Sequence, residues 1–330
     1  MDAIASEIDA QAPISRQLSD ENRGTALDIS IVVCTYNRCE SLRRVLDDLK
    51  QMKVPAGTSH EVIVVDNNSR DDTRAVVEAA RQECPGIFTY VFESRQGKSF
   101  ALNTSIKTAR GEIVAFTDDD VVLDRNWLIE MKNVFDSSGC AGIGGKIRAV
   151  WNTETPRWFA SEGPYKLGGA IVELDLGDEI CDLDRPAYGA NMAFRRHIFE
   201  KYGLFREDLG PNPQNLIRNE DSEFCRRVIY GGEKFIYAPK VVVYHPVEEN
   251  RTRKEYFEAW QFNYGRALVR INGIPSSATC YFGIPRYFFR NLLGASIRWA
   301  LTFDAKRRFY YKLQAFEAAG QITECRTRNG

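Results

Sequence analysis

The sequence predicts an α/β fold in which a mostly parallel central sheet, of the Rossmann-like kind, is flanked by helices. Short apolar runs, typical of strands buried on both faces, alternate with stretches whose apolar residues recur at helical spacing. Polar residues follow each apolar run directly, as they do where parallel strands end at one edge of a sheet. This alternation argues for parallel strands joined by helices.

The alternation begins at Ile29. The expected strands are ISIVVCTY (29–36), EVIVVD (61–66), FTYVFES (88–94) and EIVAFTD (112–118). The helix after the first strand is marked by one apolar stripe, Leu42, Val45, Leu46, Leu49 and Met52. Further helices are expected around 73–80 and 99–110. Beyond residue 125 the pattern loosens, and strands are expected at 139–151, at 185–196 and, divided by Pro239 into one or two, at 231–246.

Composition limits the classes of function. The formal net charge of the 330 residues is -1, so no bulk positive charge favours nucleic acid. Eight cysteines without a CxxC pair favour free thiols in a reducing compartment, and hence a cytoplasmic protein. No apolar run reaches the roughly 20 residues that span a bilayer. Residues 1–27 lack the basic start and apolar core of a signal peptide and are expected to form a disordered tail.

Polar side chains at the ends of the first four strands should gather at one edge of the sheet. They are Thr35 and Asn37, then Asp66, Asn67 and Asn68, then Arg95, Gln96, Gly97 and Lys98, and finally Asp118, Asp119 and Asp120. Ligands of such sheets bind beyond the carboxyl ends of the strands. Strand direction therefore predicts a binding site at this edge.

The three adjacent aspartates at 118–120 need a physical reason, because like charges repel and carboxylates are rarely buried unpaired. One interpretation is a solvated acidic turn. The other is a site for Mg²⁺ or Mn²⁺, which prefer oxygen ligands and complete their shells with water and substrate phosphates. The three other polar strand ends at the same edge favour the cation site.

Asp66 suits a nucleoside, because an acid at the end of a second strand accepts hydrogen bonds from ribose in dinucleotide folds. The alternative is an aspartate that stabilises a turn. No GxGxxG follows the first strand and no GxxxxGK[ST] occurs in the chain, so dinucleotide-binding and P-loop interpretations lose their main support.

Seven motifs in order resemble a family 2 glycosyltransferase with the GT-A fold. They are VVCTYNR, EVIVVDNNSRDDT, GKSFALN, GEIVAFTDDD, GANMAFRR, NEDSEFCRR and VVVYHP. The resemblance covers about residues 29–250. It implies one GT-A domain at 28–250, with a nucleotide-binding half at 28–125 and an acceptor half at 126–250.

The resemblance implies a site for a nucleotide-sugar donor, most often a UDP-sugar. The residues expected to bind the donor are Thr35, Asn37, Arg38, Asp66, Asn68, Gly97, Lys98, Asp118 and Asp119. Within this set Thr35, Asn37 and Asp66 match positions that hold base and ribose, whereas Lys98 could counter diphosphate charge or be a surface cation. The residues expected to hold Mn²⁺ or Mg²⁺ are Asp118, Asp120 and His245. For His245 a hydrogen-bonded strand residue is the alternative.

Glu220 and Asp221 match the ED pair of the family, in which the aspartate is the expected general base. In an inverting transfer the acceptor hydroxyl attacks the anomeric carbon opposite the leaving diphosphate, and one carboxylate takes the proton. A cation stabilises the charge on the departing phosphate. An acidic first turn of a helix explains the same residues and is compatible with this role.

On the acceptor side the resemblance places Gly189, Ala190 and Asn191, where small residues let a sugar approach the backbone. Trp151 and Trp158 could stack on sugar rings or pack in the core. The QxxRW motif of processive synthases is absent, which favours transfer of one sugar per event without excluding short polymers.

Residues 251–330 are expected to form a helical C-terminal extension. Its segment 284–312 mixes aromatic residues with seven cations and one acid. Such a segment suits an anionic membrane surface, and the alternative is a pair of helices packed on the catalytic domain. The protein is therefore expected to be cytoplasmic, either free or peripheral at the inner face of the plasma membrane.

The functional hypothesis is an inverting, metal-dependent transfer from a nucleotide-diphosphate sugar to a hydroxyl of a glycan or lipid-linked acceptor, in surface polysaccharide synthesis. A sugar-1-phosphate nucleotidyltransferase is one rival, but the loop CTYNRCES lacks the glycines expected of a triphosphate loop. An inactive membrane-associated scaffold is a second rival. Such a protein should lose its acids, yet Asp118, Asp120, Glu220 and Asp221 are present.

Overall fold

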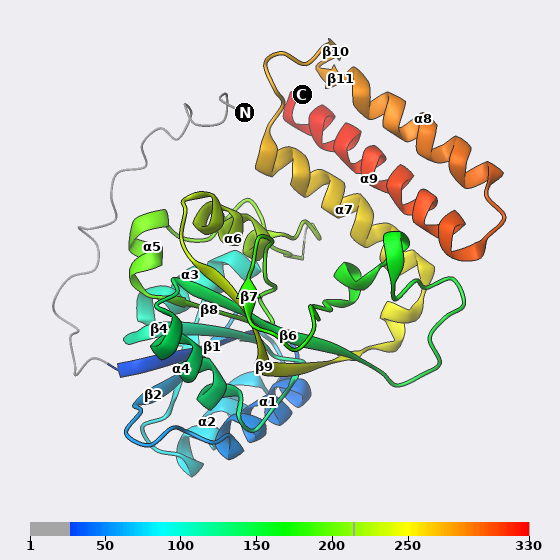
Figure 1. Ribbon diagram of the computed structural model, residues 1–330. Coiled ribbons are helices and arrows are strands. Elements are labelled where there is room, and N and C mark those ends of the chain that lie inside the picture. Colours follow the sequence, from blue (N-terminus) through cyan, green and yellow to red (C-terminus); the bar gives the residue numbers. More distant parts are fainter. Residues whose placement is uncertain (1–26, 214, 330) are drawn as a thin grey trace.

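The computed structural model describes residues 27–213 and 215–329, so the expected tail lies outside the described residues apart from Leu27 (Figure 1). The first half contains β1 (Leu27–Thr35), α1 (Cys39–Gln51), β2 (His60–Asp66), α2 (Thr73–Glu83), β3 (Phe88–Phe92), α3 (Lys98–Thr108) and β4 (Gly111–Asp118). The second half contains β5 (Val122–Leu123), α4 (Trp127–Ser138), β6 (Gly142–Trp151), η3 (Gly163–Tyr165), η4 (Gly168–Ile171), β7 (Cys181–Asp182), β8 (Asn191–Arg195), α5 (His197–Tyr202), α6 (Glu220–Tyr230) and β9 (Phe235–Val247). The C-terminal part contains η5 (Glu249–Thr252), α7 (Lys254–Asn272), β10 (Cys280–Tyr281), β11 (Ile284–Pro285), α8 (Arg286–Leu301) and α9 (Ala305–Asn329).

One large sheet with the strand order β3-β2-β1-β4-β8-β6-β9-β5 runs through the molecule, and β7 pairs with β9. This confirms the predicted α/β fold with helices on the faces of a central sheet. Strands β1 to β4 are parallel, as predicted. Strand β8 runs antiparallel to both β4 and β6, so the second half of the sheet is mixed. A long irregular connection, rather than a crossover helix, leads into β8, and this permits the reversal.

The register of the parallel strands brings their polar ends together. Thr35 of β1 lies beside Asp66 of β2, and Cys34 lies beside Asp118 of β4. The predicted gathering of polar residues at one edge is therefore confirmed. It follows from strand direction, because all three strands finish at the same level of the sheet.

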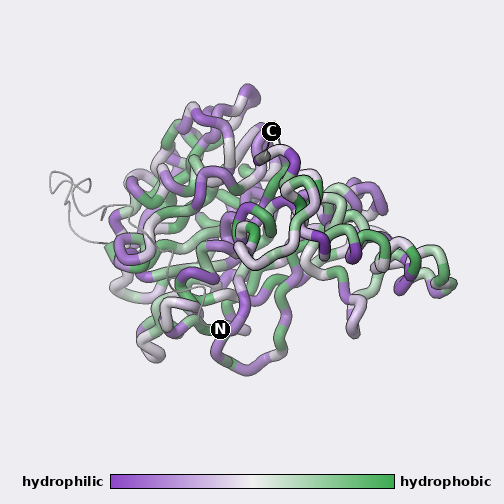
Figure 2. Tube along the Cα trace, turned by 90° about the horizontal axis from the view of Figure 1, so that it is seen from above, coloured by the Kyte–Doolittle hydropathy of each residue, from purple (hydrophilic) through white to green (hydrophobic). Residues whose placement is uncertain are grey.

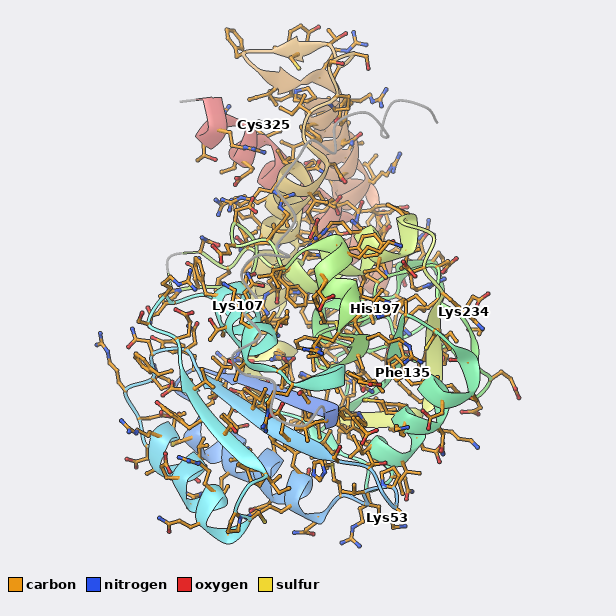
Figure 3. The ribbon with its side chains drawn as sticks, turned by 90° about the vertical axis from the view of Figure 1, so that its left-hand side faces the viewer. Lys53, Lys107, Phe135, His197, Lys234 and Cys325 are labelled. Carbon is orange, nitrogen blue, oxygen red and sulfur yellow. The ribbon has the colours of Figure 1, made fainter. Side chains whose placement is uncertain are left out.

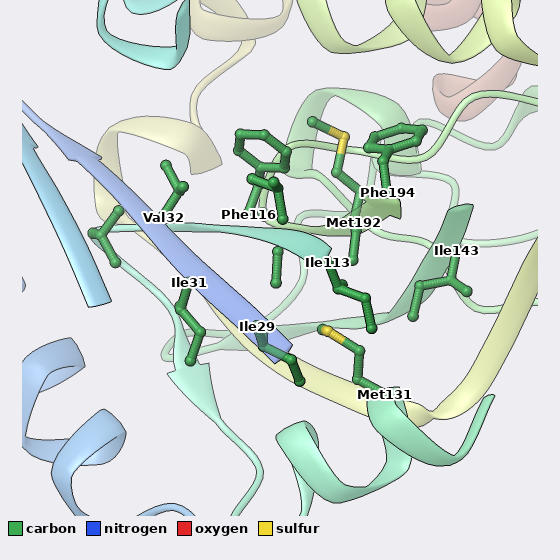
Figure 4. Packing of buried hydrophobic residues seen from close by; sticks show 14 of the residues in the cluster. Ile29, Ile31, Val32, Ile113, Phe116, Met131, Ile143, Met192 and Phe194 are labelled. Atoms are coloured by element: carbon green, nitrogen blue, oxygen red, sulfur yellow. The ribbon is translucent and has the colours of Figure 1, made fainter. Parts of the chain in front are cut away.

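The main core lies between the sheet and its helices. The apolar stripe of α1 is buried, as its helical spacing predicts. Figure 4 shows Ile31 of β1, Phe116 of β4 and Phe194 of β8 within the same packed cluster. Hydrophobic and hydrophilic stretches alternate along the trace, both in the body of the molecule and in the part that projects from it (Figure 2).

Strand β9 is one continuous strand with a β-bulge at Pro239. Proline has no backbone N–H, so this residue cannot donate a hydrogen bond to a neighbouring strand. The register against β6 shifts between Gly145 and Lys146, where residues 239–241 have no partner in β6. Asn191 bridges the bulge, because its Nδ2 donates to the carbonyl oxygens of Lys146 at 2.9 Å and Val241 at 2.8 Å. A Cβ at position 145 would lie 2.2 Å from this Nδ2. Glycine is therefore required there by a close approach.

The three C-terminal helices form a separate layer beside the sheet domain. Helix α7 lies nearest the sheet, α9 packs against α7, and α8 is outermost (Figure 1). Figure 3, seen from the side, shows these helices beyond one end of the sheet, with Cys325 far from Phe135 and Lys53. The backbones of α7 and α9 pass closely, since a Cβ on Gly265 would lie 2.1 Å from the carbonyl oxygen of Glu317.

None of the described helices combines the length and the apolar character that crossing a membrane requires.

Candidate functional site

A cavity of about 430 Å³ opens at the carboxyl ends of the parallel strands, and we call it the strand-end cavity. Most of the residues predicted to bind a donor line it: Thr35, Arg38, Gly97, Lys98, Asp118 and Asp119. Asp120 also lies on its wall. Sequence reasoning missed a second group of lining residues, Tyr36, Pro211, Pro213, Leu216, Arg218 and Arg251. The positions of these residues depend on tertiary packing. In the sequence, only the basic run ENRTR around Arg251 indicates a residue that could bind an anionic ligand.

Asp118, Asp120 and His245, the residues predicted to hold the cation, lie close together. One ligand atom from each of these residues lies within 4.8 Å of the other two. His245 Nε2 is 3.6 Å from Oδ1 of Asp120. Burial lowers the pKa of His245, which favours the neutral imidazole that binds metal ions. Its Nδ1 is buried without a hydrogen bond partner among the described residues. Two carboxylates and one imidazole therefore fit a divalent cation such as Mn²⁺.

Two arginines neutralise the other oxygen of Asp120. Oδ2 accepts from Arg38 and, at 3.2 Å, from Nη2 of Arg251. Nη1 of Arg251 also lies 3.3 Å from His245 Nε2. Burial alone would raise the pKa of Asp120, but the guanidinium groups of Arg38 and Arg251 hold it below its usual value. Asp120 thus stays ionised, with Oδ1 turned toward His245.

Asp119 behaves differently from its neighbour. Its side chain is buried, and burial together with the charge of Asp120 raises its pKa to about 7, against the opposing effect of Arg38. The three adjacent aspartates therefore do not carry three equivalent charges. This difference, together with the cations around them, explains how such a group is tolerated at the end of a buried strand.

Lys98 joins the strand-end aspartates to the second acidic centre. Its Nζ donates to Oδ1 of Asp118 at 2.7 Å and lies 3.9 Å from Oε1 of Glu220. Burial opposes its charge, but Asp118 and Glu220 raise the pKa of Lys98 above its usual value. Lys98 is consequently a fixed positive charge between the two centres.

Glu220 and Asp221 begin α6, after Asn219 in a left-handed conformation with φ 79°. Oδ2 of Asp221 accepts from the backbone N–H of Gly189 at 2.8 Å, and Oδ1 accepts from that of Ser222 at 2.6 Å. These bonds fix the orientation of the carboxylate. Glu220 is buried, and burial and the charge of Asp221 raise its pKa to about 7, with Lys98 opposing.

Three predicted donor residues do not line the strand-end cavity. Asp66 is buried and accepts from the backbone N–H of Ser69 and the hydroxyl of Tyr90, each at 2.8 Å. Asn37, with φ 51°, accepts from the backbone N–H of Arg70 at 2.7 Å, and Asn68 has φ 67°. In this structure all three stabilise the loops that border the cavity.

The predicted acceptor residues separate into two groups. Gly189 lies at the acidic pair, because a Cβ there would be 3.6 Å from Oδ2 of Asp221. Ala190 and Asn191 are buried below that surface; the Ala190 carbonyl accepts from Thr117 at 3.1 Å. Trp151 lies in an aromatic cluster, and the centroid of its ring is 4.9 Å from that of the Phe159 ring. The structure thus gives Asn191 and Trp151 packing and bridging contacts, and neither lines the strand-end cavity.

Comparison with known proteins identifies the family. The family model Glycosyl transferase family 2 matches residues 30–203, more than half of the chain. This chain is a family 2 glycosyltransferase. The glycosyltransferase is 30% identical to the succinoglycan biosynthesis protein ExoM of Rhizobium meliloti over 246 residues, which is 74% of this chain and 75% of the relative. It is 25% identical over 252 residues to a glucosyl-dolichyl phosphate glucuronosyltransferase of Haloferax volcanii, covering 74% and 78%.

Solved structures confirm the GT-A fold of the glycosyltransferase. The mannosyltransferase PcManGT of Pyrobaculum calidifontis, solved with GDP-Man and Mn²⁺, matches with a TM-score of 0.60 at 20% identity, covering 91% of this chain and 87% of that one. TarS 1–349 of Staphylococcus aureus, solved with UDP-GlcNAc, matches with a TM-score of 0.51 at 16% identity, covering 92% of each chain. This fold is thus shared with glycosyltransferases that were solved in complex with nucleotide sugars.

Proposed function

We propose that this glycosyltransferase is an inverting, metal-dependent enzyme. It moves one sugar per event from a nucleotide-diphosphate sugar, with a UDP-sugar as the first choice, to a hydroxyl of a glycan or lipid-linked acceptor. The observation that carries the proposal is the pairing of two acidic centres, Asp118–Asp120 with His245 and Glu220–Asp221, across Lys98. Such a transfer needs charge stabilisation at the leaving group and a base at the acceptor, separated by the sugar.

At the leaving group, Asp118, Asp120 and His245 would hold Mn²⁺ or Mg²⁺. When bound, the ion stabilises negative charge that develops on the departing diphosphate. Lys98 and Arg251 are placed to add positive charge on the same side. The GDP-Man and Mn²⁺ in the PcManGT structure and the UDP-GlcNAc in the TarS structure support a nucleotide-sugar at this position.

At the acceptor, Asp221 would act as the general base. Its carboxylate is held by two backbone N–H groups, from Gly189 and Ser222. As the acceptor oxygen forms a bond to the anomeric carbon, the bond from that carbon to the diphosphate breaks and Asp221 takes the hydroxyl proton. Glu220, whose pKa is raised to about 7, contributes less charge and supports Lys98.

Two rival functions have lost support. A nucleotidyltransferase conflicts with a family match that spans the strand ends. The acids that an inactive relative would be expected to lose are present and connected by hydrogen bonds and ion pairs.

The first experiment is a calorimetric titration of UDP into the protein with and without Mn²⁺. Asp120→Ala is measured in parallel, with Asp136→Ala as a control, since Asp136 is an exposed partner of Lys132 on α4. We expect UDP binding that needs both Mn²⁺ and Asp120 and that Asp136→Ala leaves unchanged. Binding that persists in Asp120→Ala would overturn the metal assignment. If UDP does not bind, GDP, CMP and TDP are titrated next.

We also propose that α8 places the enzyme on an anionic membrane surface. Leu293, Ile297 and Leu301 follow one another at four-residue spacing on its outer face and are 63%, 50% and 71% exposed. Exposed Arg286 and Arg290 continue the same face toward the start of the helix. An apolar stripe flanked by cations complements acidic headgroups and acyl chains.

Sedimentation with vesicles tests this surface. The protein should pellet with vesicles of phosphatidylglycerol and phosphatidylcholine, and much less with phosphatidylcholine alone. Leu293→Gln with Leu301→Gln should reduce pelleting several-fold, because each exposed leucine would lose its insertion into the interface. Equal pelleting of this double variant and the wild type would contradict the proposal.

A further inference from the structure

A second cavity, of about 560 Å³, lies between the sheet domain and the C-terminal helices, and we call it the helix-side cavity. Its walls come from the segments 166–176 and 185–188, from the start of α6, and from α7 and α9. None of the residues assigned above to donor, metal or base lines it. It is therefore a site distinct from the strand-end cavity.

The helix-side cavity adjoins the acidic pair. Asn219 and Ser222, which flank Glu220 and Asp221 in the chain, both line it. Tyr188 also lines it, and the next residue, Gly189, donates its backbone N–H to Asp221. On its other side Asp221 faces the strand-end cavity through Lys98, whose charge it influences. The proposed base thus lies between the two cavities.

Aromatic rings form much of the wall of the helix-side cavity. Trp260 and Tyr264, one turn apart on α7, have nearly parallel rings, with centroids 5.3 Å apart and an angle of 8° between the planes. Tyr188 lies in the same wall as this pair and is close to Trp260, because both residues approach Gly169. Tyrosine and tryptophan combine an apolar face with a polar tip, which suits a ligand that is itself amphipathic.

The Tyr188 hydroxyl has no hydrogen bond partner in residues 27–213 and 215–329. Burial beside Asp221 and Tyr264 raises its pKa to about 12, so the hydroxyl remains a donor at neutral pH. The Tyr188 hydroxyl points toward the space above Gly169. A Cβ on Gly169 would lie 3.4 Å from the Tyr188 hydroxyl oxygen and 3.7 Å from the Trp260 ring. A half-buried hydroxyl without a partner in a cavity is available to a ligand.

Charges around the helix-side cavity are balanced. Lys166 pairs with Glu173 at 3.1 Å, and Gln261 donates to Glu317 at 2.7 Å. The wall offers hydrogen bond donors and acceptors without a surplus of either sign. Aromatic faces with neutral hydrogen bonding suit a sugar ring, which presents C–H groups on its faces and hydroxyls at its rim.

We propose that the helix-side cavity binds the acceptor as a neutral saccharide, with the free face of the Trp260 ring, whose other face stacks on Tyr264, stacking on a sugar ring and the Tyr188 hydroxyl donating to a sugar oxygen. The inference rests on the proposed function for its link to Asp221. Saccharide binding itself requires neither donor nor metal. These side chains select the acceptor and present its hydroxyl to the base.

Ligand-observed saturation-transfer NMR tests the proposal with four neutral disaccharides, cellobiose, lactose, maltose and melibiose. At least one should bind the wild-type protein. Trp260→Ala should weaken that binding about tenfold, the loss expected from one stacked ring. Tyr188→Phe, which keeps the ring and removes the hydroxyl, should weaken it about threefold. Tyr230→Ala, at an exposed aromatic residue on α6 outside the cavity, should have no effect.

Gly169→Ala provides a second variant that fills space without a clash, because its methyl group would make ordinary contacts with Tyr188 and Trp260. It should weaken saccharide binding while UDP titration and the melting temperature stay unchanged. Absence of binding by all four sugars, or equal binding by wild type and Trp260→Ala, would overturn the proposal. UDP titration is read separately, so failure of the donor site and failure of the saccharide site are distinguishable.

Discussion

The strand-end cavity and the helix-side cavity share no lining residue and are built in opposite ways. The first is a dense group of charges in which the aspartates have partners of opposite sign, such as Asp118 with Lys98 and Asp120 with Arg38. The second has aromatic walls, balanced polar groups and, at Tyr188, a hydroxyl without a partner. The comparison teaches that the same protein can pair its charges closely in one cavity and leave hydrogen bonding capacity open in another, as the proposed diphosphate and sugar sites would require.

The difference also has a structural origin. The strand-end cavity is anchored by residues at the ends of hydrogen-bonded strands, whose positions the sheet register fixes. The helix-side cavity depends on how α7 and α9 pack against each other and against the segment 166–176. Changes to the two cavities should therefore be separable, and the following predictions are ordered by expected effect.

The largest effect is expected at Asp221, whose chain neighbour Ser222 lines the helix-side cavity and whose charge acts on Lys98 of the strand-end cavity. Asp221→Asn removes the proposed base but keeps an oxygen that accepts from Gly189, so the rate of sugar transfer should fall at least about a hundredfold. UDP and Mn²⁺ binding by calorimetry should stay within twofold of the wild type. Transfer at the wild-type rate by this variant would show that another group takes the proton.

Gly265→Ala should disturb the helix-side cavity alone. The new Cβ would lie 2.1 Å from the backbone oxygen of Glu317 and force α7 and α9 apart, lowering the free energy of unfolding by about 1–3 kcal/mol. Gly294→Ala on α8 is the matched control, since nothing lies within 4 Å of its Cβ. Chemical denaturation measures both. UDP binding by folded Gly265→Ala should be normal; its loss would show that the cavities are coupled.

Lys98→Met should disturb the strand-end cavity. It leaves Asp118 and Glu220 without their shared cation, so UDP affinity should fall about tenfold, as expected for one charge-assisted hydrogen bond. Lys107→Met, an exposed position on the same helix, provides the control. Saccharide binding in the NMR assay should not change, and a parallel loss there would indicate a general structural effect.

The smallest effect is a pH dependence at Glu220. Its folded pKa is raised to about 7 from a usual value of 4.5, so the folded state binds more protons than the unfolded state between these values. The neutral Glu220 carboxyl therefore stabilises the folded state at low pH, and this stabilisation decreases as the pH rises from 4.5 to about 7. Relative to Glu220→Gln, the wild type should lose stability between pH 4.5 and 7. Parallel stability curves for the two proteins would contradict the raised pKa.

Much of the strand-end site could be predicted from the sequence. Apolar runs located the strands, strand direction located their polar ends, and the structure brings Asp118, Asp120 and His245 together as expected. Arg251 and the loop at 211–218 were missed, because nothing local to those residues indicates which part of the sheet they cover. Asn191 was predicted at the acceptor side, yet its amide spans a bulge that the sequence did not reveal.

The helix-side cavity was not predicted at all. Tyr188, Trp260 and Tyr310 are distant in the chain and lie in ordinary loop and helix contexts. Trp151 and Trp158 gave the stronger sequence signal for sugar stacking, but both pack in the aromatic cluster with Phe159. An aromatic residue packs equally well in a core or beside a ligand, so its type alone does not distinguish the two.

The sequence by itself determined the family, the alternation of strands and helices, and the residues at the strand ends, because hydrophobic period and strand polarity are properties of neighbouring residues. Only the tertiary structure decided that Arg251 pairs with Asp120, that Gly265 lets α7 approach α9, and that a second cavity forms beside Asp221. Contacts between distant segments depend on how side chains and backbones fit at the point of approach, and a linear pattern does not contain that fit.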